Sequence, residues 1–190
     1  MYRPYICPYD ELLRLVPEGA TVLDIGCGAG TFLLLLAEYC KPKALGGIET
    51  RSSLVSLAQS SLEHYSQKIS IRFEPYDGRR LPEWLGNYDH LFLIDVLHHI
   101  RREEQRSFLQ KIFDSIKPGT KFIIKDIDAG QRFWCLFNKL HDLIVSQELT
   151  HEVAATDLER ILTHIGFRIN TTARKHLYVY PHFTITCTKV

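Results

Sequence analysis

A glycine-rich turn is the part of the sequence best suited to bind a ligand. The apolar run Val22–Ile25 leads directly into Gly26, Gly28 and Gly30, and a helical pattern follows. Glycine adopts positive φ without strain and lets the backbone lie close to a bound molecule. A strand, a tight glycine turn and a helix in this order bind nucleotides, but Gly-x-Gly alone does not separate NAD or FAD from other adenosine-containing ligands.

Four acidic side chains lie at the ends of four successive strand-like runs, and their charge narrows the choice of ligand. They are Asp24, Glu49, Asp77 and Asp95. Glu49 follows Gly26 by 23 residues, where an acid accepts both hydroxyls of a ribose. Asp24 would repel the pyrophosphate that a dinucleotide brings to a glycine turn. The four acids predict a negative crescent that suits a ligand with cationic groups, and they disfavour an NAD(P)-dependent oxidoreductase.

Short apolar and β-branched runs alternate with helical patterns along the chain. The expected strands are 21–25, 45–48, 69–73, 91–94, 121–127, 168–173 and 182–188, and the expected helices are 31–40, 53–64, 102–116 and 156–165. Thr156–Glu159 has the pattern of a capping box, which predicts the start of the last helix. Continuous apolar strands between helices indicate a parallel sheet covered on both faces. The sequence predicts a doubly wound α/β fold: a mostly parallel seven-stranded sheet, helices on both faces and an antiparallel terminal strand.

Length and composition limit the class of protein. The 190 residues predict one domain, 1–190, and 45% hydrophobic against 24% charged residues exclude wholesale disorder. The 23 basic and 22 acidic residues leave a net charge of +1, which argues against a dedicated nucleic-acid binder. Five scattered cysteines argue against disulfides and structural zinc, and no signal peptide or membrane-length apolar run is visible. We therefore expect a cytoplasmic protein without a transmembrane segment.

Five segments together resemble a known family. They are Val22–Gly30, Gly47–Glu49, Tyr76–Gly78, Tyr88–Ile100 and Ile116–Thr120. They are similar to the motifs of the class I, seven-stranded S-adenosylmethionine-dependent methyltransferases, and the resemblance covers nearly the whole chain. S-adenosylmethionine carries a sulfonium and an ammonium group against one carboxylate, so it also fits the predicted negative crescent. The resemblance implies S-adenosylmethionine as methyl donor and S-adenosylhomocysteine as product.

The resemblance also assigns residues to the cofactor. Glu49 would bind the ribose, Asp77 the adenine amino group and Asp95 the methionine moiety, while Asp24 would order the glycine turn. The complete set that the resemblance implies is Asp24, Gly26, Cys27, Gly28, Gly30, Glu49, Thr50, Arg51, Asp77, Gly78 and Asp95. Two of the acids also have an ordinary interpretation, because Asp24 can cap the glycine turn and Asp77 can begin a type I turn.

The sequence does not fix a catalytic residue. His98, His99 and His141 are candidates for a general base, although packing in the core or ordering of a helix start is the simpler interpretation for His98 and His99. Asp126 and Asp128 end the fifth expected strand and are possible metal ligands. No asparagine follows them to complete the metal pattern of catechol-type relatives, so we expect no metal.

The expected reaction is methylation of a small, apolar or aromatic acceptor at oxygen or carbon. The segment Asp95–Ile100 lacks the Asn/Asp-Pro-Pro-aromatic motif of relatives that methylate planar amino groups. We expect the short N-terminal segment 1–20, the segment 128–153 and the last hairpin to contact the acceptor. The residues expected to line its site are Phe133, Trp134, Phe137, Leu140, Leu143, Tyr178, Tyr180 and Phe183. The alternative is a catalytically silent S-adenosylmethionine-binding module that regulates a partner.

Overall fold

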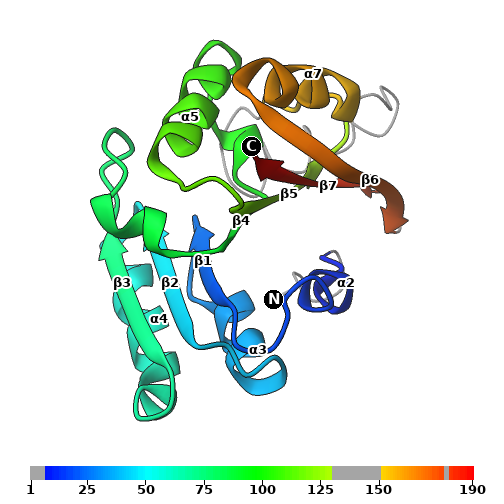
Figure 1. The fold of residues 1–190 in the computed structure, drawn as a ribbon. Helices are drawn as coiled ribbons and strands as arrows, with labels where there is room; N and C mark the ends of the chain where they lie inside the picture. The colour runs from blue at the N-terminus through cyan, green and yellow to red at the C-terminus, as the bar shows by residue number, and fades with distance from the viewer. Residues whose placement is uncertain (1–6, 130–150, 178–179) are drawn as a thin grey trace.

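The computed structural model of the chain describes residues 7–129, 151–177 and 180–190 (Figure 1). Its elements are α2 (Tyr9–Leu13), β1 (Thr21–Ile25), α3 (Thr31–Tyr39), β2 (Ala44–Glu49), α4 (Ser52–Leu62), η1 (Glu63–Tyr65), β3 (Ser70–Pro75), η2 (Glu83–Asn87), β4 (His90–Ile94), η3 (Leu97–His99), α5 (Arg102–Ser115), β5 (Lys121–Ile127), α7 (Ala155–Ile165), β6 (Phe167–Leu177) and β7 (Tyr180–Lys189). Strands alternate with helical segments as far as β5, as the hydrophobic pattern predicts.

The strands of the described chain form one sheet in the order β3-β2-β1-β4-β5-β7-β6. β1 to β5 pair in parallel, and β7 is antiparallel to both of its neighbours, β5 and β6. The predicted α/β fold with an antiparallel terminal strand is confirmed. The chain order reverses between β1 and β4, and open α/β sheets bind ligands at the carboxyl ends of the strands beside such a switch point.

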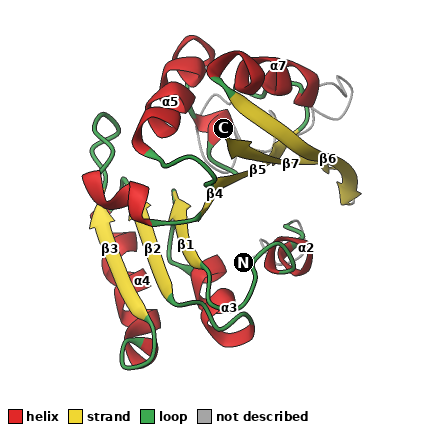
Figure 2. Ribbon diagram, in the orientation of Figure 1, coloured by secondary structure: helices red, strands yellow, loops and turns green. Residues whose placement is uncertain are grey.

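Successive strand residues enter two separate cores, because their side chains point alternately to opposite faces of the sheet. Leu23 and Leu91 belong to the core under α5 and α7, whereas Val22 and Phe92 belong to the core under α2 and α3. Helices therefore cover both faces, as Figures 1 and 2 show. Burial on both faces explains why the central strands are continuous apolar runs in the sequence.

The last hairpin is longer than the sequence predicts. β6 and β7 extend beyond the expected ranges 168–173 and 182–188. The added part of β6 includes Arg174 and Lys175, which form ion pairs with Asp128 and Glu11. Charged residues are common on edge strands, but they interrupt the apolar pattern from which strands are predicted.

The start of α7 differs from the predicted capping box. The N-cap residue Ala154 makes no side-chain hydrogen bond, and Thr156 lies inside the helix. Instead, Oδ1 of Asp128 accepts a hydrogen bond from the backbone N–H of Ala155 at 3.2 Å. The capping-box prediction was wrong because a carboxylate 27 residues earlier in the chain binds the first helical N–H.

In the described part of the chain, no helix is long and apolar enough to cross a membrane. Most of the predicted acceptor segment 128–153 lies outside the described residues, and so do His141, Tyr178 and the aromatic and apolar residues expected between 133 and 143.

Candidate functional site

The glycine turn after β1 packs against the loop that follows β4. Gly26 has a φ of 79°, and a Cβ atom on it would lie 2.4 Å from Cγ2 of Val96. The backbone N–H groups of Gly26 and Cys27 donate to the carbonyl oxygen of Ile48 at 2.8 and 3.1 Å, which joins the turn to β2. Gly30 is the N-cap residue of α3. A side chain at Gly26 would separate two loops that meet at the switch point.

Glu49, the last residue of β2, is fixed by three hydrogen bonds. Its Oε2 accepts from the N–H of Gly28, and its Oε1 accepts from Oγ1 of Thr50 and the N–H of Arg51, each at 3.0 Å. The residue is 8% exposed. A carboxylate has about four acceptor sites, so about one remains for a ligand hydroxyl. The predicted ribose role can use that remaining site.

A cavity of ≈ 1370 Å³ opens at the carboxyl ends of β1, β2 and β4. Ligand pockets commonly measure about 300–1,000 Å³, so this cavity has room for a cofactor and a second small molecule. The predicted cofactor residues that line it are Gly26, Gly28, Glu49, Thr50, Arg51, Gly78 and Asp95.

Two of the four predicted acids do not line this cavity. Asp24 lies within β1 and is 3% exposed. Asp77 is exposed, and its Oδ1 accepts from the backbone N–H groups of Arg79 and Arg80 at 2.7 and 2.9 Å. The hydrogen bonds from Arg80 and Arg79 lower the pKa of Asp77 from its ordinary value. On the cavity wall, the predicted crescent is reduced to Glu49 and Asp95.

Basic side chains also line the cavity, which the sequence interpretation did not anticipate. They are Arg51, Arg79, Arg101 and Lys111. Arg101 forms an ion pair with Glu104, and Nζ of Lys111 donates to the carbonyl oxygen of Arg79 at 3.3 Å. Three acids, Glu49, Asp95 and Glu104, line the same cavity, so the charge at its wall is mixed.

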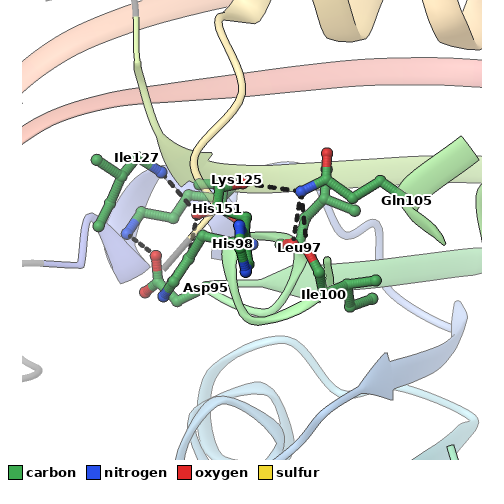
Figure 3. Close-up of polar contacts among 9 residues, drawn as sticks. Asp95, Leu97, His98, Ile100, Gln105, Lys125, Ile127 and His151 are labelled. Carbon is green, nitrogen blue, oxygen red and sulfur yellow. Dashed lines mark hydrogen bonds and ion pairs between the residues drawn. The ribbon is translucent and has the colours of Figure 1, made fainter. Parts of the chain in front are cut away.

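Asp95, the residue after β4, is joined to β5 by Lys125. The Oδ1 atom of Asp95 lies 2.6 Å from Nζ of Lys125, and its backbone N–H donates to the Lys125 carbonyl oxygen at 2.9 Å. The Lys125 side chain is 0% exposed, and Figure 3 shows it extended toward Asp95. Sequence reasoning missed this residue. Its signal was a lysine directly after the apolar run Phe122–Ile124 of this strand.

His98 in η3 is held by Asp126, which follows Lys125 in β5. Nδ1 of His98 lies 2.5 Å from Oδ1 of Asp126, and the His98 backbone N–H donates to Oδ2 at 3.2 Å. Burial opposes ionisation of Asp126, but the charge and hydrogen bond of His98 hold the pKa of this carboxyl below its ordinary value. His98 is 6% exposed and does not line the cavity, whereas His99 is exposed and does.

Gln105 in α5 fixes the loop that contains these histidines. Its Nε2 donates to the carbonyl oxygens of Leu97, Ile100 and His151 at 3.1, 3.1 and 2.8 Å, as Figure 3 shows. The N–H of His151 donates to the carbonyl oxygen of His98 at 2.7 Å, and His151 lines the cavity. Sequence reasoning missed Gln105 and His151, because nothing in a helical pattern distinguishes a glutamine that binds three carbonyls from a solvated one.

The two acids considered as metal ligands have other partners. Asp126 binds His98, while Asp128 binds the N–H of Ala155 and forms an ion pair with Arg174 at 3.4 Å. Within residues 7–129, 151–177 and 180–190, no three His, Cys, Asp or Glu side chains are grouped so that they could hold a metal ion.

Cys27 and Phe183 are both buried. Burial, reinforced by the negative charges of Asp24 and Glu49, raises the pKa of the Cys27 thiol far above its ordinary value. Such a thiol stays protonated, so Cys27 does not act as a nucleophile.

Phe183 is 1% exposed and packs in the core under α5 and α7, so the prediction that it lines the acceptor site was wrong.

The strand order and the cavity at the switch point define the fold of the class I, seven-stranded methyltransferases. Residues 2–172 match the family model described as a methyltransferase domain, and the chain belongs to that family. The magnesium protoporphyrin IX methyltransferase of Synechocystis PCC 6803, solved with bound S-adenosylhomocysteine, superposes with a TM-score of 0.74 at 20% identity. That match covers 96% of this chain and 81% of the other.

Two curated relatives are similar at the level of sequence. An O-methyltransferase of Pyrenophora dematioidea is 26% identical over 163 residues, which is 84% of this chain and 59% of the relative. The carboxy-S-adenosyl-L-methionine synthase of Campylobacter curvus is 25% identical over 117 residues, which is 62% of this chain and 48% of the relative. The chain therefore spans about half to three-fifths of the length of these two relatives.

Proposed function

We propose that this chain transfers a methyl group from S-adenosylmethionine to an oxygen atom of a small, apolar or aromatic acceptor. The observation that carries the proposal is the Glu49 carboxylate, which is fixed by Gly28 at the wall of a cavity that the glycine turn also lines. A buried carboxylate with a remaining acceptor site suits a hydroxyl of a ribose. Membership of the methyltransferase-domain family supports methyl transfer, and the O-methyltransferase relative favours oxygen as the acceptor atom.

The strand order supports one orientation of the donor. β2, which ends at Glu49, lies between β3 and β1, and β4 lies on the other side of β1. With the ribose at Glu49, the adenine would extend toward Gly78 after β3, and the charged methionine end would extend toward Asp95 after β4. Bound S-adenosylmethionine supplies an activated methyl group, so the protein mainly has to align the acceptor and exclude water.

Residues after β4 and on α5 offer a surface for the acceptor. Val96, Ile100 and Phe108 contribute apolar side chains to the cavity, which suits an apolar or aromatic ring. A weakly acidic hydroxyl needs a general base to become a nucleophile. We assign this role to His99, because it lines the cavity while its neighbour His98 is buried against Asp126.

The first experiment tests the donor. Calorimetric titrations of the purified chain with S-adenosylmethionine, S-adenosylhomocysteine and NAD should show binding of the first two and none of NAD. Binding of NAD without S-adenosylmethionine would overturn the proposal in favour of an oxidoreductase.

The second experiment tests the reaction. The chain is incubated with methyl-labelled S-adenosylmethionine and a panel of simple phenols, and labelled aryl ethers and S-adenosylhomocysteine are expected. His99→Gln should lower kcat by about a hundredfold with little change in donor affinity. His164→Gln, an exposed position on α7, is the matched control. Donor binding without turnover of any acceptor would favour the silent binding module instead.

A further inference from the structure

Lys125 is unusual among the charged residues near the cavity because its side chain is fully buried. Lysine is almost never fully buried unless it is paired, because removing its charge from water is costly. Here the side chain is 0% exposed, and its ammonium group lies 2.6 Å from Oδ1 of Asp95. The Asp95 side chain is 18% exposed and lines the cavity. The pair therefore extends from the interior of the sheet to the cavity wall.

The backbone of Asp95 shows how firmly the pair is held. Its φ of 54° lies in the left-handed region, where aspartate is tolerated but still strained. Two contacts with Lys125, one through the side chain and one through the Asp95 N–H, hold this conformation. Strained residues of this kind cluster at binding sites when the surrounding structure over-determines them. Lys125 thus fixes where the Asp95 carboxylate lies on the wall.

The Lys125–Asp95 pair is electrically neutral as a unit, and the groups closest to it do not change this. Burial, followed by the positive charge of Lys125, lowers the pKa of His182 to about 4, so His182 is uncharged near neutral pH. Asp126 leaves β5 on the opposite face of the sheet and is bound to His98. An aspartate and a lysine in contact cancel most of each other's field at the cavity.

We propose that Lys125 is a positioning residue for the methyl donor, and that the neutral Lys125–Asp95 pair sets how strongly the site distinguishes the cationic sulfonium donor from the neutral thioether product. The inference rests on the proposed function, which directs the charged end of S-adenosylmethionine toward Asp95. S-adenosylmethionine and S-adenosylhomocysteine share the adenosine and amino-acid groups and differ by the methyl group and its positive charge. The ratio of their affinities therefore reports the net charge of the wall beside the sulfur.

The two single substitutions should move this ratio in opposite directions. In Asp95→Asn, the buried Lys125 cation loses its counter-ion and repels the sulfonium, so the preference for S-adenosylmethionine over S-adenosylhomocysteine should fall by about fivefold. In Lys125→Met, the uncompensated Asp95 carboxylate attracts the sulfonium, so the preference should rise by about fivefold. In the double variant the wall is neutral again, and the ratio should return to within about twofold of the original protein.

The test is calorimetric titration of both ligands at about pH 7. Lys121→Met, at the exposed start of β5, is the matched control and should leave both affinities unchanged. A purely structural role predicts that both ligands weaken equally, that the ratio stays constant and that the double variant restores nothing. Any of these results would overturn the inference.

Two further outcomes separate this inference from the proposed function. If the original protein binds neither ligand, the proposed function fails, and the inference fails with it. If the original protein binds both and only the variants disagree with expectation, the inference alone fails.

Should Lys125→Met not fold, Asp95→Asn decides by itself, since asparagine tolerates a left-handed backbone. A fall in the ratio supports the inference, and an unchanged ratio overturns it.

Discussion

Lys125 and Asp126 are adjacent in β5, yet they hold the loop after β4 from opposite faces of the sheet. Lys125 binds Asp95 on the face that α2 and α3 cover, and Asp126 binds His98 on the face that α5 and α7 cover. This division follows from the pleat, since successive strand residues point to opposite sides. One dipeptide therefore fixes two positions, Asp95 and His98, of a loop that also presents His99 to the cavity.

Glu49→Ala should weaken the affinity for S-adenosylmethionine by more than about tenfold, which corresponds to about 1.4 kcal/mol. The substitution removes the acceptor proposed for the ribose and leaves the N–H groups of Gly28 and Arg51 without their partner. Calorimetric titration measures the change, with Glu63→Ala at an exposed position as control. An affinity equal to that of the original protein would mean that the ribose lies elsewhere.

Gln105→Leu should lower the free energy of unfolding by about 1–3 kcal/mol, although leucine has a similar size. The change leaves the carbonyl oxygens of Leu97, Ile100 and His151 without the donor that now binds all three. Chemical denaturation gives the loss. Gln110→Leu in the same helix is the control, because that amide donates to the side chain of Asp114 on the surface. Equal losses in both variants would contradict the bridging role.

Asp128→Ala should destabilise the protein by about 0.5–2 kcal/mol, the usual cost of losing a helix cap. Thr156→Ala should cost much less, because Thr156 lies inside the helix and does not cap it. Chemical denaturation of both variants distinguishes two origins of the cap. One is Asp128, which follows β5, and the other is the local capping box that the sequence suggested. A larger loss in Thr156→Ala would restore the local cap.

The alternation of apolar runs and helical patterns was sufficient to predict the parallel sheet, since burial on both faces leaves a strong local signal. The bounds of β1 and β5 were predicted to the residue, and Glu49 was expected at the end of a strand beside the glycine turn. These features depend on residues that are close in sequence or on a motif of fixed spacing.

The interactions that complete the site join residues far apart in sequence, and they were not predicted. Lys125 and Asp95 are 30 residues apart, and Gln105 and His151 are 46 residues apart. Whether such side chains meet depends on strand register and on the angle at which a helix crosses the sheet. The sequence therefore predicted the β2 side of the cavity better than the β4 side, where proposed acceptor contacts and catalysis lie.

His182 should make stability depend on pH between about 6.5 and about 4. Burial first, and then the positive charge of Lys125, lowers its pKa to about 4, although the negative charges of Asp95 and Asp126 act in the opposite direction. In the unfolded chain a histidine titrates at about 6.5. Between these values the unfolded state binds a proton that the folded state does not, so stability is complete above about pH 6.5 and falls as the pH is lowered toward about 4.

The size and the test of this effect follow from the same two pKa values. Each pH unit in the window costs up to about 1.4 kcal/mol, and the whole window costs about 3 kcal/mol. Denaturant titrations at stepped pH should show this slope in the original protein and a flatter one in His182→Asn, which cannot take up the proton. His164→Asn, on the exposed face of α7, should keep the original slope. The contribution of the Asp126 carboxylate does not interfere, because its lowered pKa confines its loss of stability to pH values below about 3.9. If His182→Asn kept the slope of the original protein, the buried imidazole would not be the group that senses acid in this range.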